Sequence, residues 1–409
     1  MRLPIYALVL AANPTAASAA PITFDHAIEL AVAHAPSIAA RTAASGASRS
    51  AAGSAAALPD PRLEFGFTGF PVSGPNAGRP ERDDFSTVRV GIEQDIPNLA
   101  KRRARSGRAA ADIAATDAAA TGEIRTVRLS AALAWVDLYY AGSKLAALDA
   151  VRKSINPLIS TTPARLASGS MRPAQTVEPA LLVAAIDDRR AELVAEAGKA
   201  TAALTRWTGE PAPSPAGMPP LWSVDEIQLR GTLEHLPMIA VADAASAQAS
   251  ADVGLARAEK RPDWSWQVGY DRRDPRFGDM LSAGVKIGLP LFSRSRQDPL
   301  IAAREQDVQR TRFDREASLR ELQAGLDADL AEYAMRRERA NRAQTVLLPL
   351  AERRSTLQRA SYAGGTASLE DALAAVIAVA EARLEVLARQ AEVVRGALRI
   401  NLTYRSEDR

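Results

Sequence analysis

An internal duplication is the feature of this sequence that most constrains its fold. A His-x-Pro-x-Ile motif at residues 34–38 recurs at residues 235–239, 201 residues later. An ordered set of such repeats indicates two copies of one structural unit. Three further pairs follow in the same order at a nearly constant separation: Pro59-Asp60 with Pro262-Asp263, Gly91-Ile92 with Gly284-Val285, and residues 166–170 with residues 362–366.

The N-terminal segment and the Pro-rich segment between the repeats predict how the chain is divided into domains. Residues 1–19 have a positive start, a short apolar core and a small-x-small site, so we predict a secretory signal cut after Ala19. A first repeat is then expected at residues 20–209, a Pro-rich linker at 210–223 and a second repeat at 224–409. The chain has no cysteine, so we expect neither disulfide bonds nor a lipid on an N-terminal cysteine.

Each repeat predicts the same order of elements: a helix, two strands, one very long helix, a glycine-containing turn and a second helix. The first helix is expected at residues 24–58 and again at 229–260. A long helix over residues 99–155 would extend roughly 80 Å at 1.5 Å per residue. The long helices carry apolar residues at the heptad spacing of coiled coils, as at Leu373, Ile377, Ala380, Leu384 and Leu387. A secreted coiled-coil structural protein is one alternative interpretation of these helices.

The predicted strands alternate apolar and polar residues, while residues 71–84 and 271–279 are polar and are expected to form loops. This alternation suits a sheet with one face in lipid and one in water, although an ordinary half-buried sheet has the same pattern. No apolar run beyond the signal reaches the roughly 20 residues of a helical membrane span, so a membrane role would require the strands. Four strands cannot close a barrel, but three copies would supply about twelve. We assign four residues to the water-filled side of such a barrel: Arg89, Glu93, Gln267 and Lys286.

The sequence contains no recognisable catalytic motif or metal-binding motif. It has three histidines, no cysteine, no P-loop and no nucleophile elbow, so we predict no enzyme, no cofactor and no metal site. His34 and His235 are repeat partners beside prolines, which indicates a structural role. The net charge of +3 comes from 51 basic and 48 acidic residues that are mixed along the chain, so no nucleic-acid partner is expected. An extracytoplasmic helical enzyme is an alternative that has no candidate site.

Together these features resemble the TolC family of bacterial outer-membrane efflux proteins. The resemblance rests on the duplicated strand ends Ile96-Pro97 and Leu289-Pro290, the opening at residues 23–31 and the turn at residues 362–373. It implies a mainly α fold with a small transmembrane β part, in which a homotrimer forms a periplasmic α-barrel topped by a shared β-barrel of about twelve strands in outer-membrane lipid. It also implies a passive channel that works with a periplasmic adaptor protein and an inner-membrane pump of the RND type.

The resemblance further implies roles for two helical tips. In the family the glycine-containing turns meet the adaptor. Asp371 matches an acidic position near the closed end of the pore, where threefold symmetry would gather three carboxylates, and a solvated helix residue is the alternative. The family's second acidic position and its basic latch residue are Ala374 and Ala367 here. The docking residues implied are Arg165, Leu166, Gly169 and Ser170 in the first repeat, and Tyr362, Gly365 and Thr366 in the second.

The cargo is indicated by two shorter stretches. Residues 58–64, which enter the first strand, and the basic run Lys101-Arg102-Arg103 resemble the CzcC-type branch of the family. That branch works with heavy-metal cation pumps, so the resemblance implies metal cations as substrates. A duct for drugs and organic toxicants is the alternative.

Overall fold

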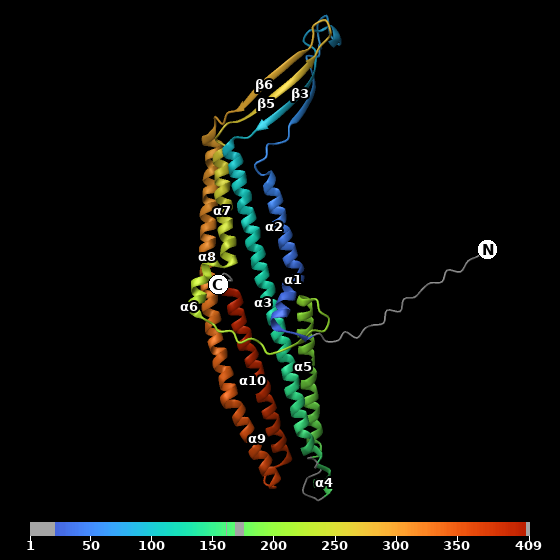
Figure 1. Cartoon of the computed structure of the whole chain (residues 1–409), viewed down its shortest axis with the longest axis vertical. Helices are drawn as coiled ribbons and strands as arrows, with labels where there is room; N and C mark the ends of the chain where they lie inside the picture. Colours follow the sequence, from blue (N-terminus) through green and yellow to red (C-terminus); the bar gives the residue numbers. More distant parts are fainter. Residues whose placement is uncertain (1–20, 161, 168–175, 406–409) are drawn as a thin grey trace, which may run out of the picture. The chain divides into compact units, whose positions relative to one another are not determined.

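The first half of the chain contains two short helices, a strand pair, one long helix and a return helix (Figure 1). The computed structural model describes residues 21–160, 162–167 and 176–405. The elements of this half are α1 (Phe24–His34), α2 (Pro36–Ser54), β2 (Arg62–Thr68), β3 (Thr87–Ile96), α3 (Leu99–Ser160), α4 (Thr162–Ala167) and α5 (Glu178–Thr208).

The second half runs through the same order again. None of the helices in the described ranges is both long enough and apolar enough to cross a membrane. The predicted fold class, mainly helical with a small β part and an internal duplication, is confirmed. The elements are α6 (Glu226–Thr232), η3 (Leu233–His235), α7 (Pro237–Ala258), β5 (Asp263–Arg272), β6 (Met280–Gly288), α8 (Ser293–Arg342), a π-helical turn (Ala343–Leu347), α9 (Leu348–Ala363) and α10 (Leu369–Tyr404).

The opening helix of each repeat is broken where the sequence predicted one continuous helix. Pro36 begins α2, and Ala35 before it is extended, with φ −65° and ψ 117°. Pro237 begins α7 in the same way, after Leu236 with φ −72° and ψ 147°. Proline favours extended backbone in the residue before it and is well placed in a first helical turn. The expected helices at 24–58 and 229–260 are therefore corrected to shorter segments, and the first of these ends at Ser54.

The chain divides into two compact units, which cut across the two sequence repeats. Unit 1 consists of Met1–Pro36, Glu123–Leu233 and Gln323–Arg409, and unit 2 of Ser37–Gly122 and Glu234–Leu322. Each unit therefore takes segments from both repeats. The long helices α3 and α8 contribute residues to both units.

Unit 1 contains the two large apolar clusters. In the first, Trp135 of α3 is fully buried and its indole N–H donates to the carbonyl of Ile22 at 2.8 Å. Phe24 meets Trp135 edge to face, with ring centroids 5.5 Å apart. The short strand β1 (Pro21–Ile22) pairs with β4 (Ser214–Pro215) of the inter-repeat segment. The beginning of the chain and the linker are thus fixed against the long helix.

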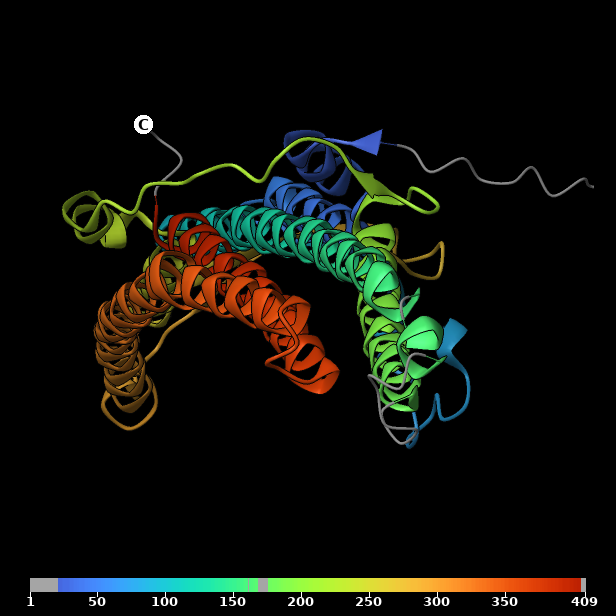
Figure 2. The same cartoon turned by 90° about the horizontal axis from the view of Figure 1, so that it is seen from below.

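The second cluster joins the two helix pairs of unit 1. Figure 2 shows α5 beside α3 and α9 beside α10. Large apolar side chains from all four helices fill the cluster, and each contributes about 1.5–3 kcal/mol when fully buried. Its members include Leu148, Val151, Ile155, Leu182, Ile186, Leu193, Tyr362, Leu369 and Leu373.

The helices of unit 2 pack through small residues and are joined by ion pairs. The buried residues of α7 are mostly alanines, namely Ala244, Ala249, Ala256 and Ala258, together with Ile239 and Val253. Small side chains allow helices to approach closely but bury little apolar area. Cross-helix ion pairs link α3, α7 and α8: Arg108 with Asp252, Arg257 with Glu305 at 2.6 Å, Lys260 with Asp298 at 2.5 Å, and Arg315 with Asp243 at 2.5 Å.

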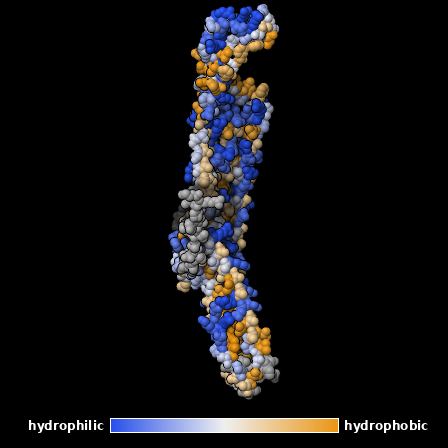
Figure 3. All heavy atoms as spheres, turned by 90° about the vertical axis from the view of Figure 1, so that its right-hand side faces the viewer, coloured by the Kyte–Doolittle hydropathy of each residue, from blue (hydrophilic) through white to orange (hydrophobic). Residues whose placement is uncertain are grey.

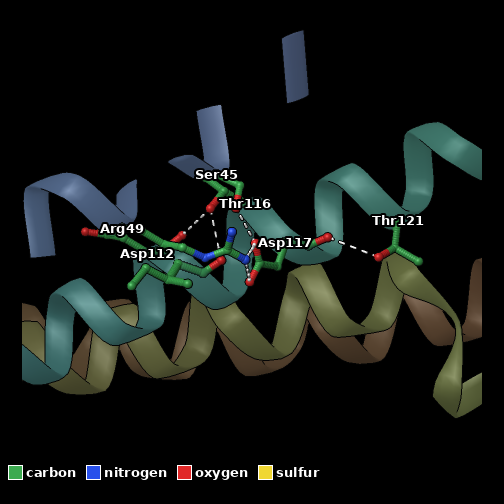
Figure 4. A network of polar contacts seen from close by, with 7 residues as sticks. Ser45, Arg49, Asp112, Thr116, Asp117 and Thr121 are labelled. Atoms are coloured by element: carbon green, nitrogen blue, oxygen red, sulfur yellow. Dashed lines mark hydrogen bonds and ion pairs between the residues drawn. The ribbon is translucent and has the colours of Figure 1, made fainter. Parts of the chain in front are cut away.

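A polar clasp attaches α2 to α3 (Figure 4). Ser45 is the buried residue of α2, and its hydroxyl donates to the Asp117 carboxylate. One Nη of Arg49 bonds both oxygens of the same carboxylate at 2.9 Å. The hydroxyl of Ser45, followed by the guanidinium of Arg49, holds the pKa of Asp117 below its usual value. The clasp therefore requires the ionised carboxylate.

Replacing Asp117 with Asn should weaken the attachment of α2 at neutral pH. Because the pKa of Asp117 is lower in the folded chain than in the unfolded chain, its contribution is present at neutral pH. It is lost as the pH falls through that lowered pKa, below the ordinary 3.8. Urea unfolding should show Asp117→Asn less stable than the parent at neutral pH and equal to it in stronger acid. Asp188→Asn, on the exposed side of α5, is the control, and an equal loss in both variants would contradict the clasp.

Candidate functional site

The four strands of unit 2 form one antiparallel sheet in the order β2-β3-β5-β6. One face is apolar and uncovered by the rest of unit 2. Leu63, Phe65 and Leu281 are 73–77% exposed on it. Figure 3 shows apolar residues gathered at the level of the sheet. The pleat places the side chains of alternate residues together on this face, which consists of Leu63, Phe65, Phe67, Val88, Val90, Ile92, Trp264, Trp266, Val268, Tyr270, Leu281, Val285 and Ile287.

The opposite face is polar and is held together by two ion-pair networks. Arg89 of β3 donates to both oxygens of Asp271 of β5, from Nε at 2.7 Å and Nη2 at 3.1 Å. Ser282 of β6 donates to the same carboxylate at 3.0 Å. In the second network Glu93 accepts from Lys286 at 2.9 Å and from the hydroxyl of Ser265 at 3.3 Å. Each network links three neighbouring strands.

The four residues predicted for the water-filled side all lie on this polar face. Arg89, Glu93 and Lys286 belong to the networks, and Gln267 is paired in register with Glu93 and Gly284. Gly284 provides the room for Gln267, because a Cβ at this glycine would stand 3.0 Å from the Gln267 amide nitrogen. The sheet thus brings the four predicted residues to one surface, as strand alternation required.

Asp271 is a residue of this surface that the sequence analysis misplaced. It was expected to begin an exposed loop at residues 271–279, but β5 continues to Arg272 and Asp271 is 3% exposed. The carboxylate is buried because Arg89 and Ser282 both bond it. The alternation of Ser265, Gln267 and Gly269 would have included Asp271 if it had been followed two residues further.

The second helical tip, residues 361–371, is a sharp turn between α9 and α10. Gly365 has φ +78°, a conformation that costs other residues about 1–2 kcal/mol. Its N–H donates to the Tyr362 carbonyl at 3.2 Å, and the N–H of Thr366 donates to the Ser361 carbonyl at 2.9 Å. These are the two hydrogen bonds of a Schellman motif. Tyr362 is buried in the apolar cluster, whereas Gly365 and Thr366 are exposed at the turn.

Asp371 takes part in the capping box at the start of α10. Ser368 is the N-cap: its Oγ accepts from the Asp371 N–H at 3.0 Å, and its own N–H and hydroxyl donate to Asp371 Oδ2 at 3.2 and 2.7 Å. These hydrogen bonds, the hydroxyl first, keep the pKa of Asp371 below its usual value. The carboxylate therefore has a structural role at the base of the tip, and its Oδ1 has no hydrogen-bond partner among the described residues. Ala374, one turn further on, is exposed.

The first tip is described only in part. Arg165 and Leu166 lie in α4, and Leu166 is 41% exposed. Gly169 and Ser170 lie outside the described residues, as does the predicted cleavage site after Ala19.

Over the part of the chain that the structure describes, no three His, Cys, Asp or Glu side chains gather as a metal site would require.

Comparisons with known proteins agree on one architecture. Residues 229–401 match the family described as Outer membrane efflux protein. No curated protein sequence matches the chain as a relative. The fold is similar to that of the CusC channel, with a TM-score of 0.77 at 16% identity over 94% of this chain and 92% of that one. The CmeC outer membrane channel of Campylobacter jejuni gives a TM-score of 0.77 at 13% identity over 93% and 85%. The outer membrane protein VceC of Vibrio cholerae gives 0.75 at 20% over 93% and 96%.

Replacing Gly365 with Ala should loosen the second tip by about 1 kcal/mol, because an L-residue is strained at positive φ. Hydrogen exchange at the amides of Gly365 and Thr366 measures this local opening, and a roughly fivefold faster exchange is expected. Gly364→Ala is the matched control, since Gly364 has φ −76° and an added Cβ makes only ordinary contacts. Equal acceleration in both variants would show that the backbone conformation of Gly365 does not stabilise the turn.

Proposed function

Because residues 229–401 match the outer membrane efflux protein family and the fold is similar to that of outer-membrane channels, we propose that the chain is a member of this family, also called the TolC family. We propose further that it is the passive duct of a tripartite efflux system that exports heavy-metal cations. It is a channel component and not an enzyme. Three arguments support the proposal: how the sheet would close, what charge its polar face carries, and how its ionisable groups are paired.

The sheet has two edges, and neither can remain open in lipid. Strands β2 and β6 each have a neighbour on one side only. Unpaired backbone N–H and C=O groups cost several kcal/mol each in a bilayer. Three copies of the sheet, joined edge to edge, would pair every strand in a barrel of about twelve strands. The apolar face would then meet lipid, and the polar face with Arg89, Glu93, Gln267 and Lys286 would line the water-filled lumen.

The strand residues of the polar face carry a net negative charge, which is the observation that carries the cation assignment. The strands place five carboxylates and three basic groups on this face, a net charge of −2 per chain and −6 per trimer, while Lys101 and Arg105 of α3 add positive charge only at its helical end. A negatively lined passage favours cations and resists anions. The carboxylates are Glu64, Glu93, Asp95, Asp263 and Asp271, and the basic groups are Arg62, Arg89 and Lys286.

Because most of these carboxylates are held in ion pairs, they favour the passage of metal cations through the duct over tight binding of the cations. Glu93 and Asp271 are bonded to Lys286 and Arg89, and Asp263 is bonded to Lys101 at 2.7 Å. A carboxylate held in an ion pair is a poor competitor for a hydrated metal ion, yet its charge still contributes to the field of the lumen. A duct requires this combination, because an ion must leave as easily as it enters.

The helical tips are proposed to meet a periplasmic adaptor protein, through which the duct would work with an inner-membrane RND-type pump. The docking residues proposed are those of the first tip, Arg165, Leu166, Gly169 and Ser170, and Tyr362, Gly365 and Thr366 of the second. Asp371 is proposed as a gate residue, because its Oδ2 is engaged by Ser368 while Oδ1 remains available to face the pore. Three copies would bring three such carboxylates together around the axis.

Deleting the gene should sensitise the bacterium to divalent heavy metals. Growth is measured across zinc, cobalt, cadmium and copper and across a panel of dyes, detergents and antibiotics. Sensitivity to the metals that the intact gene restores is the expected result. Sensitivity to the organic compounds alone would overturn the metal assignment, leave the duct itself intact and favour drug efflux.

Replacing Glu64 with Gln should reduce the cation preference of the reconstituted channel. Glu64 has no ion-pair partner among the described residues, and its removal changes the net charge of the strand residues on the polar face from −2 to −1 per chain. The reversal potential in a salt gradient should therefore move toward zero. Glu29→Gln is the control, since this side chain is 75% exposed on α1. An unchanged reversal potential in Glu64→Gln would overturn the proposed role of the polar face.

A further inference from the structure

Where the sheet of unit 2 meets its helices, the surface carries a basic belt and an apolar collar. We propose that this surface binds the headgroups of anionic phospholipids in the membrane leaflet next to the helices. The basic belt consists of Arg103, Arg261 and Arg296, and the apolar collar of Leu99, Leu291 and Phe292. The inference rests on the proposed duct function, in which the apolar face of the sheet meets lipid.

The residues of the belt lie close together because three helix ends are bonded there. The side-chain amide of Asn98, just before α3, donates to the Ala258 carbonyl at the end of α7 at 3.1 Å. Lys260, just after α7, pairs with Asp298 in the first turns of α8 at 2.5 Å. Figure 1 shows α3, α7 and α8 side by side where strands β3 and β6 end and β5 begins. Arg261 thus lies between the start of α3 and the start of α8.

The basic residues at the start of α3 lie on two opposite sides of the helix. Lys101 bonds Asp263, and with Arg105 it lines the cleft under the polar face of the sheet. Leu99 lies two residues before Lys101, which places it about 200° around the helix. It is 57% exposed, and Arg103 follows it by one turn on the same side. Leu99 and Arg103 therefore face away from the polar cleft, toward the side of the apolar sheet face.

The start of α8 repeats this arrangement of an apolar residue followed by an arginine. Leu291 and Phe292 are 75% and 72% exposed. The Phe292 carbonyl accepts from the Arg296 N–H at 3.2 Å, so the two residues are already one helical turn apart. Trp264 of the apolar sheet face is paired with Ile287 near the same end. Tryptophan and basic side chains beside an apolar surface are typical of a membrane interface.

The three belt arginines are unpaired, as are Arg105 and Arg312 of the same helices, whereas several basic neighbours have carboxylate partners. Arg257, Lys260, Arg304 and Arg310 are paired in this way. No hydrogen bond or ion pair joins the guanidinium groups of Arg103, Arg261 and Arg296 to any other described residue, and all three residues are exposed. A guanidinium fork suits a phosphodiester, and each basic residue at an anionic surface contributes about fivefold in affinity.

The test measures which lipids the full-length protein retains. The protein is reconstituted in phosphatidylcholine vesicles containing roughly one-fifth phosphatidylglycerol, extracted in mild detergent and examined by native mass spectrometry. The parent should retain phosphatidylglycerol in preference to phosphatidylcholine. The triple variant Arg103→Gln, Arg261→Gln, Arg296→Gln should lose at least tenfold of this preference, and high salt should reduce the preference of the parent.

The same helix provides matched controls. Arg312 and Phe313 are exposed on α8, about 24 Å or more from Arg296 along the helix axis. Arg312→Gln should keep the lipid preference, and Phe313→Ser should keep it where Phe292→Ser weakens it. Equal retention by the parent and the triple variant would overturn the proposal, and so would equal loss in Arg312→Gln. Displacement of the lipid by millimolar inorganic phosphate would overturn it as well, because it would indicate a simple anion site.

Conductance of the same vesicles separates this inference from the duct proposal. Channels that conduct normally but show no phosphatidylglycerol preference would refute the lipid site alone. A parent protein that inserts but does not conduct would refute the duct. If the triple variant does not assemble, Phe292→Ser with its Phe313→Ser control decides the question, because neither changes the charge.

Discussion

The four-stranded sheet has two open edges, and in a bilayer one chain could not pair them by itself. Every backbone N–H and C=O must be paired in a bilayer, yet β2 and β6 each leave one side open. The same strands expose a continuous apolar face from Leu63 to Ile287 that unit 2 does not cover. In the proposed duct, edge-to-edge closure of three copies and contact with lipid would resolve both features together. The polar face would then become an interior surface.

The two units of the chain are stabilised in different ways. Unit 1 holds large side chains, with Trp135 fully buried and bonded to the Ile22 carbonyl. The helices of unit 2 meet through alanine and are fixed by cross-helix ion pairs such as Arg257 with Glu305. Individual exposed ion pairs contribute little free energy, but they define which residues face each other where small side chains would permit sliding.

Charge pairing also distinguishes the surfaces of unit 2. On the polar face of the sheet, Arg89 and Lys286 are bonded to carboxylates on neighbouring strands, so their charges are held in fixed positions. At the junction with the helices, Arg103 and Arg296 have no such partners among the described residues. An arginine without a partner in the protein can bond a partner outside it. The same residue type thus stabilises the sheet in one place and offers an external contact in another.

The sequence by itself determined the duplication, the helical and strand periodicities and the turn at Gly365, because these depend on local spacing and on backbone conformation. Strand alternation also assigned Arg89, Glu93, Gln267 and Lys286 to one face before any pairing was known. Which residues bond each other was decided only by the tertiary structure. Asp271 is 182 residues from Arg89, and Lys286 is 193 from Glu93. Such partners depend on strand order and register, which no local pattern encodes. The break at Pro36, the capping role of Asp371 and the division into units that cross the repeats likewise required the packed chain.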